Sequence, residues 1–169
     1  EKELEVEHGE LASRLAEGGV DFILLETMNT IREAYAACKA AKETGKDVVV
    51  SFTCNHQGML LSGEPLQDAV RAVAELSPTA FSINCVSPRF IMLGVKELKR
   101  STKLPFALYG NVGLPESDKH GWEFTHDVQE DEYARCAVEW QREGAAIIGG
   151  CCGTTPAYIR QVARERERI

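Results

Sequence analysis

The chain alternates short apolar runs with stretches of helical periodicity, and this alternation limits its possible folds more than any other feature. Four of the five runs carry β-branched residues, and each leads into a polar turn; the runs span residues 20–26, 47–53, 79–85, 104–109 and 145–149. Continuous apolar runs of this length predict strands that are buried on both faces. Strands that alternate with helices predict an α/β fold with a parallel sheet and right-handed crossovers.

Helical periodicity fills the segments between the runs. Apolar residues recur at spacings of three and four over residues 31–41, 66–76, 91–98 and 133–140, and a leading helix is expected over residues 4–17. Two expected helix starts carry a hydroxyl residue followed by proline: Ser87 with Pro88, and Thr155 with Pro156. This pairing predicts a side-chain cap with proline at the first helical position.

The five predicted strands allow two architectures. They form an open, doubly wound sheet, or they belong to a TIM barrel, whose eight units need about 250 residues. At 169 residues, the length alone favours the open sheet. No linker rich in Pro, Ser or Gly divides the chain, so residues 1–169 are expected to form a single domain. The longest connection, residues 110–129, is expected to be a functional or mobile loop.

Charge and composition argue against several functions. The 19 basic and 26 acidic residues give a net charge of −7, and no basic cluster lines an aromatic-rich segment, so nucleic acid and acidic membranes are poor partners. The apolar runs are far shorter than the roughly 18 residues that a membrane span requires. Six cysteines, two of them adjacent, are too sparse for a disulfide framework and favour a cytoplasmic chain with metal-binding or reactive thiols.

Three of the cysteines stand at the ends of predicted strands. Cys85 ends one strand, and Cys151 and Cys152 leave another within the motif GGCCGTTP. Because the carboxyl ends of parallel strands gather at one edge of the sheet, we expect these three thiols to meet there. Three thiolates with an open fourth position are typical of a catalytic zinc site. The other three cysteines are expected to pack in the core, and a redox role for the adjacent pair is the alternative.

Five groups of motifs occur in order along the whole chain. They are GVDFILLET at residues 19–27, VVSFT at 49–53 with SGEPL at 62–66, INC at 83–85, YGNVGLPE at 109–116, and GGCCGTTPAYI at 149–159. Together they resemble the homocysteine S-methyltransferase family, whose members share a zinc-dependent, homocysteine-binding barrel. The resemblance implies that the five βα units are the C-terminal units, strands 4 to 8, of a TIM (β/α)8 barrel. It also implies that the chain is a fragment that lacks the first three strands.

The resemblance assigns roles to individual residues. It implies that Cys85, Cys151 and Cys152 are the zinc ligands and act directly in catalysis. Glu26 matches an acidic residue that helps to hold the amino group of homocysteine. Asn111 matches a position near the metal.

The implied activity is zinc-dependent transfer of a methyl group to the thiol of homocysteine, which forms methionine. Zn²⁺ is the implied cofactor, and the implied partners are homocysteine, a methyl donor and the missing N-terminal part of the same barrel. S-methylmethionine, S-adenosylmethionine, betaine and methylcobalamin all stay open as donors. The alternative is a truncated, non-catalytic remnant of the barrel whose cysteines bind a metal or form a redox pair.

Overall fold

Five parallel strands form the main sheet, and helices connect them. The computed structural model describes residues 2–113, 115–118, 121–124 and 127–167, with side chains outside residues 114–126. The strands are β1 (Phe22–Met28), β2 (Asp47–Phe52), β3 (Ala80–Asn84), β4 (Phe106–Gly110) and β7 (Ile147–Gly150). The helices are α1 (Lys2–Glu17), α2 (Ile31–Lys42), α3 (Leu66–Ala74), α4 (Ile91–Ser101), α5 (Glu130–Arg142) and α6 (Pro156–Arg166). The five predicted strands are confirmed, with ends that differ by at most two residues.

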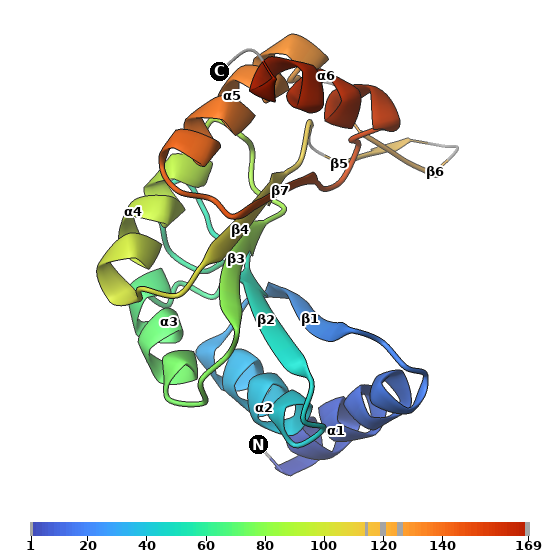
Figure 1. The fold of residues 1–169 in the computed structure, drawn as a ribbon, viewed down its shortest axis with the longest axis vertical. Coiled ribbons are helices and arrows are strands. Elements are labelled where there is room, and N and C mark those ends of the chain that lie inside the picture. Colours follow the sequence, from blue (N-terminus) through green and yellow to red (C-terminus); the bar gives the residue numbers. More distant parts are fainter. Residues whose placement is uncertain (1, 114, 119–120, 125–126, 168–169) are drawn as a thin grey trace.

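The strand order distinguishes between the two expected architectures. The order is β1-β2-β3-β4-β7, which follows the chain, and all neighbouring strands are parallel. The sheet curves, and α2, α3, α4 and α5 follow its convex side (Figure 1). In a doubly wound sheet the strand order reverses at a switch point and helices cover both faces. The open doubly wound sheet favoured by length alone is therefore wrong, and the units are arranged as in part of a TIM barrel.

The core lies between the sheet and its helices. Phe52 of β2 and Phe81 of β3 are fully buried, and their rings stack with centroids 6.2 Å apart. Gly94 of α4 lies directly against β3, since a Cβ atom added there would be 2.7 Å from Ile83 Cδ1. Two of the cysteines expected in the core, Cys38 and Cys54, are buried there. The helices complete this layer with fully buried Leu66, Val70, Val73, Ile91, Val95 and Leu98.

The two edge strands expose apolar side chains. Within the described residues, β1 and β7 each pair with one neighbour in the sheet. Phe22 and Leu24 of β1 are 52% and 40% exposed, and Ile147 of β7 is 60% exposed. Large apolar side chains of an edge strand are usually covered by a further strand or by another element. No described helix is long and apolar enough to cross a membrane.

Two local expectations have different outcomes. Thr155 caps α6 as predicted, because its hydroxyl accepts a hydrogen bond from Ala157 N and Pro156 is the first helical residue. The predicted Ser87 side-chain cap is wrong, since α4 begins only at Ile91. Residues 88–90 form a turn in which the Ser87 carbonyl accepts from Phe90 N at 2.8 Å. Ser-Pro favours turns as well as helix starts, and here the turn forms.

The predicted long loop contains regular structure. Within residues 110–129 lies an antiparallel hairpin of β5 (Pro115–Asp118) and β6 (Gly121–Phe124). The hairpin projects from the end of the curved sheet that carries β7, near α6 (Figure 1). Its strands pair with each other and not with the main sheet. The connection after β4 is therefore a projecting arm at the carboxyl edge of the sheet.

Candidate metal centre

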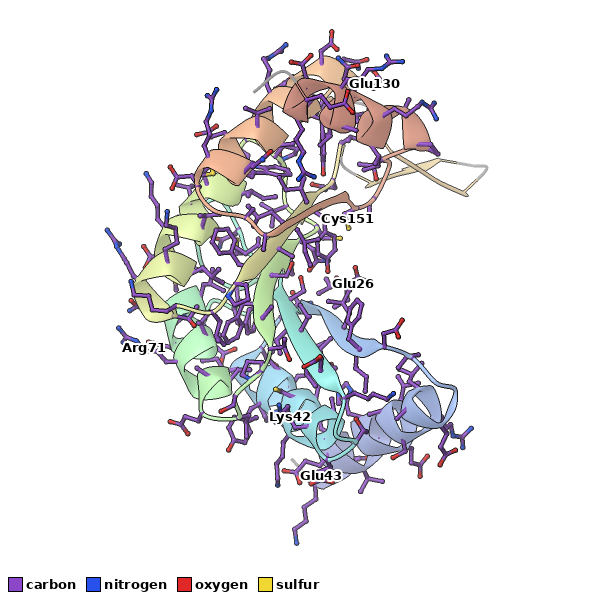
Figure 2. All side chains as sticks on the ribbon, viewed as in Figure 1. Glu26, Lys42, Glu43, Arg71, Glu130 and Cys151 are labelled. Carbon is purple, nitrogen blue, oxygen red and sulfur yellow. The ribbon has the colours of Figure 1, made fainter. Side chains whose placement is uncertain are left out.

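The carboxyl ends of three strands place the candidate ligands. Cys85 directly follows β3, Asn111 directly follows β4, and Cys151 and Cys152 directly follow β7. The register pairs Asn84 with Tyr109 and Tyr109 with Gly149, so the three strand ends are level. In Figure 2, Cys151 and Glu26 both lie on the concave side of the sheet. Strand order and register thus bring together residues that are 66 positions apart in the sequence.

The three thiols form one compact cluster. Cys85 Sγ lies 2.7 Å from Cys151 Sγ and 3.6 Å from Cys152 Sγ, and the two adjacent cysteines have their Sγ atoms 3.8 Å apart. All three side chains are half-buried. Zinc–sulfur bonds of about 2.3 Å in a tetrahedral site place sulfur atoms about 3.8 Å apart. Two of the three distances match this spacing, and the 2.7 Å contact would lengthen by about 1 Å around an ion.

Unusual backbone conformations aim the thiols. Cys85 adopts a positive φ of 53°, a left-handed conformation that is uncommon for residues other than glycine. After β7, Cys151 N donates to Gly110 O at 2.9 Å, and the chain then turns through Gly153 at a φ of 77°. The Thr154 hydroxyl donates to Cys151 O at 2.6 Å and holds this turn. The glycine-flanked turn predicted from the sequence is therefore present, and both adjacent thiols face Cys85.

The thiols perturb one another's protonation. The hydrogen bond from Cys85 lowers the pKa of Cys151 to about 6, and the same contact raises the pKa of Cys85. Burial raises the pKa of Cys152. The cluster thus stabilises one thiolate near neutral pH by hydrogen bonding from its neighbours. A cation at this position would stabilise further thiolates, because it replaces the protons that the sulfur atoms share.

Asn111 directly follows β4, whereas Glu26 lies on β1. Asn111 Nδ2 donates to Gly113 O at 3.0 Å, while its buried Oδ1 has no hydrogen-bond partner among the described residues. Glu26 lies on β1, with an exposed carboxylate close to Tyr109. Burial, and then the charge of Glu26, raise the pKa of Tyr109. The structure therefore places Asn111 beside the cysteine turns and Glu26 beside Tyr109.

The sequence reasoning missed Asn84, which lies at the centre of this region. Asn84 is fully buried at the end of β3, and its side chain reaches Thr27, Ser51 and Cys151. A buried amide residue at the end of the predicted strand, inside the motif INC, was the signal available in the sequence. The motif does not indicate which residues Asn84 contacts, because these residues are distant in the sequence.

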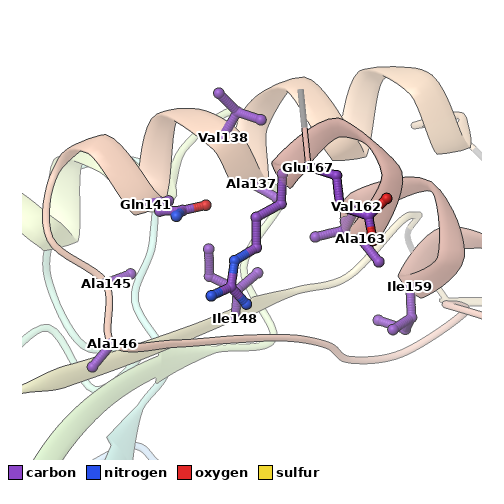
Figure 3. A pocket seen from close by; sticks show the side chains of 11 residues that line it. Ala137, Val138, Gln141, Ala145, Ala146, Ile148, Ile159, Val162, Ala163 and Glu167 are labelled. Carbon is purple, nitrogen blue, oxygen red and sulfur yellow. The ribbon is translucent and has the colours of Figure 1, made fainter. Parts of the chain in front are cut away.

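A separate cavity lies away from the cysteines. Its volume is about 480 Å³, and it is enclosed by α5, α6 and β7 (Figure 3). Ile148, Ile159 and Val162 line it, and none of the three clustered cysteines does. The cysteines lie instead at the carboxyl edge, where the active sites of barrel enzymes are found.

Consecutive parallel βα units with a three-thiol cluster at their carboxyl edge define a barrel-type α/β protein with a candidate thiolate metal site. The family model described as homocysteine S-methyltransferase matches residues 1–166, and the chain belongs to this family. Homocysteine S-methyltransferase 4 of Zea mays is 34% identical over 156 residues, which are 89% of this chain and 45% of the relative. Methionine synthase of Mycobacterium tuberculosis is 32% identical over 162 residues, which are 91% of this chain and 13% of that protein.

Solved structures agree with the sequence relatives. The apo crystal structure of the homocysteine methyltransferase MmuM from Escherichia coli superposes with a TM-score of 0.80 at 26% identity, covering 97% of this chain and 57% of that one. The metallated form of the same enzyme gives a TM-score of 0.73 at 28% identity, covering 92% of this chain and 52% of that one. This chain thus spans about half the length of the homocysteine S-methyltransferases that it matches.

Proposed function

We propose that this chain carries the zinc- and homocysteine-binding part of a methyltransferase that moves a methyl group to the thiol of homocysteine and forms methionine. The proposal makes Cys85, Cys151 and Cys152 the zinc ligands. One observation carries it: the three Sγ atoms lie within 2.7 to 3.8 Å of one another at the carboxyl ends of β3 and β7. Family membership supplies the reaction class.

The residues present fit a zinc ion. Thiolates are soft ligands that suit zinc, and three of them leave a fourth position for a substrate sulfur. The buried Oδ1 of Asn111, which has no partner among the described residues, supplies a polar atom at the same strand ends. Zinc, when bound, lowers the pKa of a thiol that joins it and so makes a nucleophile available at neutral pH.

The chain's own side chains would orient the amino acid. The ammonium group of homocysteine carries a positive charge, and Glu26 presents an exposed carboxylate on the concave side. Tyr109 lies next to this carboxylate and has a buried hydroxyl without a hydrogen-bond partner among the described residues. Glu26 would hold the ammonium group while the cysteine cluster receives the sulfur. A fixed amino end and a fixed sulfur leave the thiolate free to attack a methyl carbon in line.

We further propose that residues 1–169 are the C-terminal five units, strands 4 to 8, of a closed TIM barrel. The chain covers only 45% of the Zea mays relative and 57% of the apo MmuM chain. The edge strands β1 and β7 expose the apolar side chains of Phe22, Leu24 and Ile147, which the side chains of the missing strands would cover once the barrel closes. The proposed partner for these edges is the N-terminal part of the same barrel, and the methyl donor would contact both parts.

Metal analysis of a cysteine variant tests the ligand assignment. The Cys151→Ala variant should lose most of its bound zinc, because two thiolates remain where three are needed. The matched control is Cys136→Ala, which removes a half-buried thiol from α5, outside the cluster. Zinc content is measured by inductively coupled plasma mass spectrometry after gel filtration. Stoichiometric zinc in Cys151→Ala would overturn the ligand assignment.

An activity assay tests the reaction. The chain is expressed together with the N-terminal half of the Zea mays relative, and methionine is measured by mass spectrometry. Homocysteine is supplied with each of four donors in turn: S-methylmethionine, S-adenosylmethionine, betaine and methylcobalamin. Methionine formation that depends on one donor and disappears in Cys151→Ala supports the proposal. Zinc binding without methionine from any donor would favour a non-catalytic metal site.

One observation favours a second candidate, a redox cysteine pair. Cys85 Sγ and Cys151 Sγ are 2.7 Å apart, the shortest of the three sulfur distances. Thiol titration with and without a chelator separates the two functions. A metal site protects three thiols until the chelator is added. A redox pair loses two titratable thiols on exposure to oxidised glutathione, and the chelator does not change that number.

A further inference from the structure

The side-chain amide of Asn84 connects β1, which carries Glu26, with the cysteine cluster at the end of β7. Its Oδ1 accepts hydrogen bonds from Ser51 Oγ at 2.7 Å and from Thr27 N at 3.3 Å. Its Nδ2 donates to Thr27 Oγ1 at 2.7 Å and points to Cys151 Sγ at 4.0 Å. The side chain is fully buried. One buried amide therefore contacts β1, β2 and the cysteine turn after β7.

The contact with Thr27 holds an irregular part of β1. The register between β1 and β2 breaks between Leu25 and Met28, so Glu26 and Thr27 lie in a bulge. Thr27 has a φ of 62°, which is unfavourable for a β-branched residue. Conformations of this kind are strained and persist only where neighbouring groups enforce them. The backbone N–H and the hydroxyl of Thr27 both bind Asn84.

A bulge of this kind changes the direction of the neighbouring side chain. Bulges occur next to active sites, where they re-aim a residue or end strand pairing. Here the neighbouring residue is Glu26, whose carboxylate lies on the concave side of the sheet (Figure 2). Asn84 therefore fixes the backbone next to the group that would hold the amino end of the substrate.

The contact with the cysteines is made by Nδ2, the same nitrogen that donates to the Thr27 hydroxyl. Cys85, the next residue after Asn84, has the other unusual backbone angle of the site, a φ of 53°. An N–H that donates to a sulfur ligand orients it and shares its negative charge. The Thr53 hydroxyl, which donates to Cys85 O at 3.4 Å, supports the same turn.

We propose that Asn84 is a positioning residue that couples the Glu26 bulge to the cysteine cluster, so that the amino-acid end and the sulfur end of the substrate are held in one fixed relation. This inference rests on the proposed function. An ordinary core role would be met by an apolar side chain, since β3 is otherwise buried on both faces. The buried amide costs stability unless its groups are bonded, and its partners Thr27 and Cys151 border the site.

The first experiment follows the bulge in the metal-free chain. Amide hydrogen exchange at Thr27 is measured by nuclear magnetic resonance in the wild type, in Asn84→Ala and in Ser82→Ala. Ser82 is the matched control, because it is a fully buried polar residue of the same strand that bonds Ala107 O instead. Exchange at Thr27 should become at least about tenfold faster in Asn84→Ala and stay unchanged in Ser82→Ala. Equal protection of Thr27 in the wild type and in Asn84→Ala would overturn the proposal.

The second experiment uses Co²⁺, whose sulfur-to-metal absorption reports thiolate ligation directly. Loss of a group that orients a ligand typically weakens metal affinity by about 10- to 100-fold, and this is the loss expected in Asn84→Ala. Homocysteine binding, followed as a change in the same absorption, should weaken by at least about tenfold. Ser82→Ala should bind both as the wild type does. Wild-type affinity of Asn84→Ala for Co²⁺ and homocysteine would overturn the proposal.

A rescue variant separates the effect of Asn84 on the β1 bulge from its effect on the cysteine cluster. Glycine adopts a φ near 62° without penalty, so Asn84→Ala/Thr27→Gly should recover part of the homocysteine affinity lost in Asn84→Ala. It should not recover Co²⁺ affinity, because the contact to Cys151 is still missing. Recovery of neither in a folded double variant would contradict the coupling. If the wild-type chain shows no thiolate absorption with Co²⁺, the proposed function fails, and the Thr27 exchange rates still decide the role of Asn84.

Discussion

Removing the Tyr133 hydroxyl should both destabilise the chain and weaken its metal site. Tyr133 lies on α5, is fully buried, and joins the ends of β4 and β7. Its hydroxyl accepts from Gly110 N at 3.0 Å and donates to Gly149 O at 2.7 Å. Tyr133→Phe loses a neutral hydrogen bond worth about 1 kcal/mol and leaves the buried Gly110 N–H without an acceptor, which costs about 2 kcal/mol more. The expected loss in the free energy of unfolding is about 3 kcal/mol.

Tyr158→Phe is the matched control. Tyr158 is buried against the Tyr133 ring, and its hydroxyl donates to Val128 O at 2.9 Å and accepts from no backbone N–H of the described residues. Its loss should cost about 1 kcal/mol. With a urea m-value of about 2 kcal/mol per M, the midpoints measured by circular dichroism should fall by about 1.5 M for Tyr133→Phe and about 0.5 M for Tyr158→Phe. Equal midpoint shifts would refute the reasoning.

The same pair of variants tests the connection to the metal site. Gly110 directly precedes Asn111, and Gly149 lies two residues before Cys151. Displaced strand ends should weaken Co²⁺ affinity by about tenfold in Tyr133→Phe, measured by competition with a chromophoric chelator. Tyr158→Phe should keep wild-type affinity. Unchanged affinity in a destabilised Tyr133→Phe would show that the hydroxyl supports the fold alone.

Three further predictions concern packing, capping and protonation. Gly94→Ala should lower stability by about 1–3 kcal/mol in urea denaturation, because the new Cβ would lie 2.7 Å from Ile83 Cδ1; wild-type stability would contradict this packing. Thr155→Ala should lower the free energy of unfolding by about 1 kcal/mol, since the α6 cap is lost. Thr155→Ser keeps a capping hydroxyl and should retain most of the wild-type stability in the same assay. In the metal-free chain, a Cys151 pKa of about 6 keeps the thiolate dominant at pH 7, so its alkylation by iodoacetamide should slow only as the pH falls through about 6. Peptide mass spectrometry measures the alkylation rate of Cys151 against pH. In Cys85→Ala this pH profile should move to higher pH, because the thiol that donates a hydrogen bond to Cys151 is removed.

Local sequence patterns predicted most of the architecture. Continuous apolar runs located all five strands of the main sheet, because burial on both faces of a parallel strand leaves such a run. Thr155 with Pro156 located the start of α6 for a similarly local reason. Ser87 with Pro88 failed, since a turn and a helix start use the same residues and the surrounding packing selects between them. The hairpin within residues 110–129 lacked a strong alternating pattern and was expected as a loop.

The sequence by itself determined that Cys85, Cys151 and Cys152 lie at strand ends, since strands and glycine-rich turns follow from neighbours along the chain. Tertiary structure decided that the sheet has sequential strand order, because periodicity is compatible with both architectures and length alone favours the open sheet. It also decided the partners of Asn84, since Thr27 and Cys151 are 57 and 67 residues away. Hydrogen bonds across such separations depend on strand order and register, which no local pattern encodes.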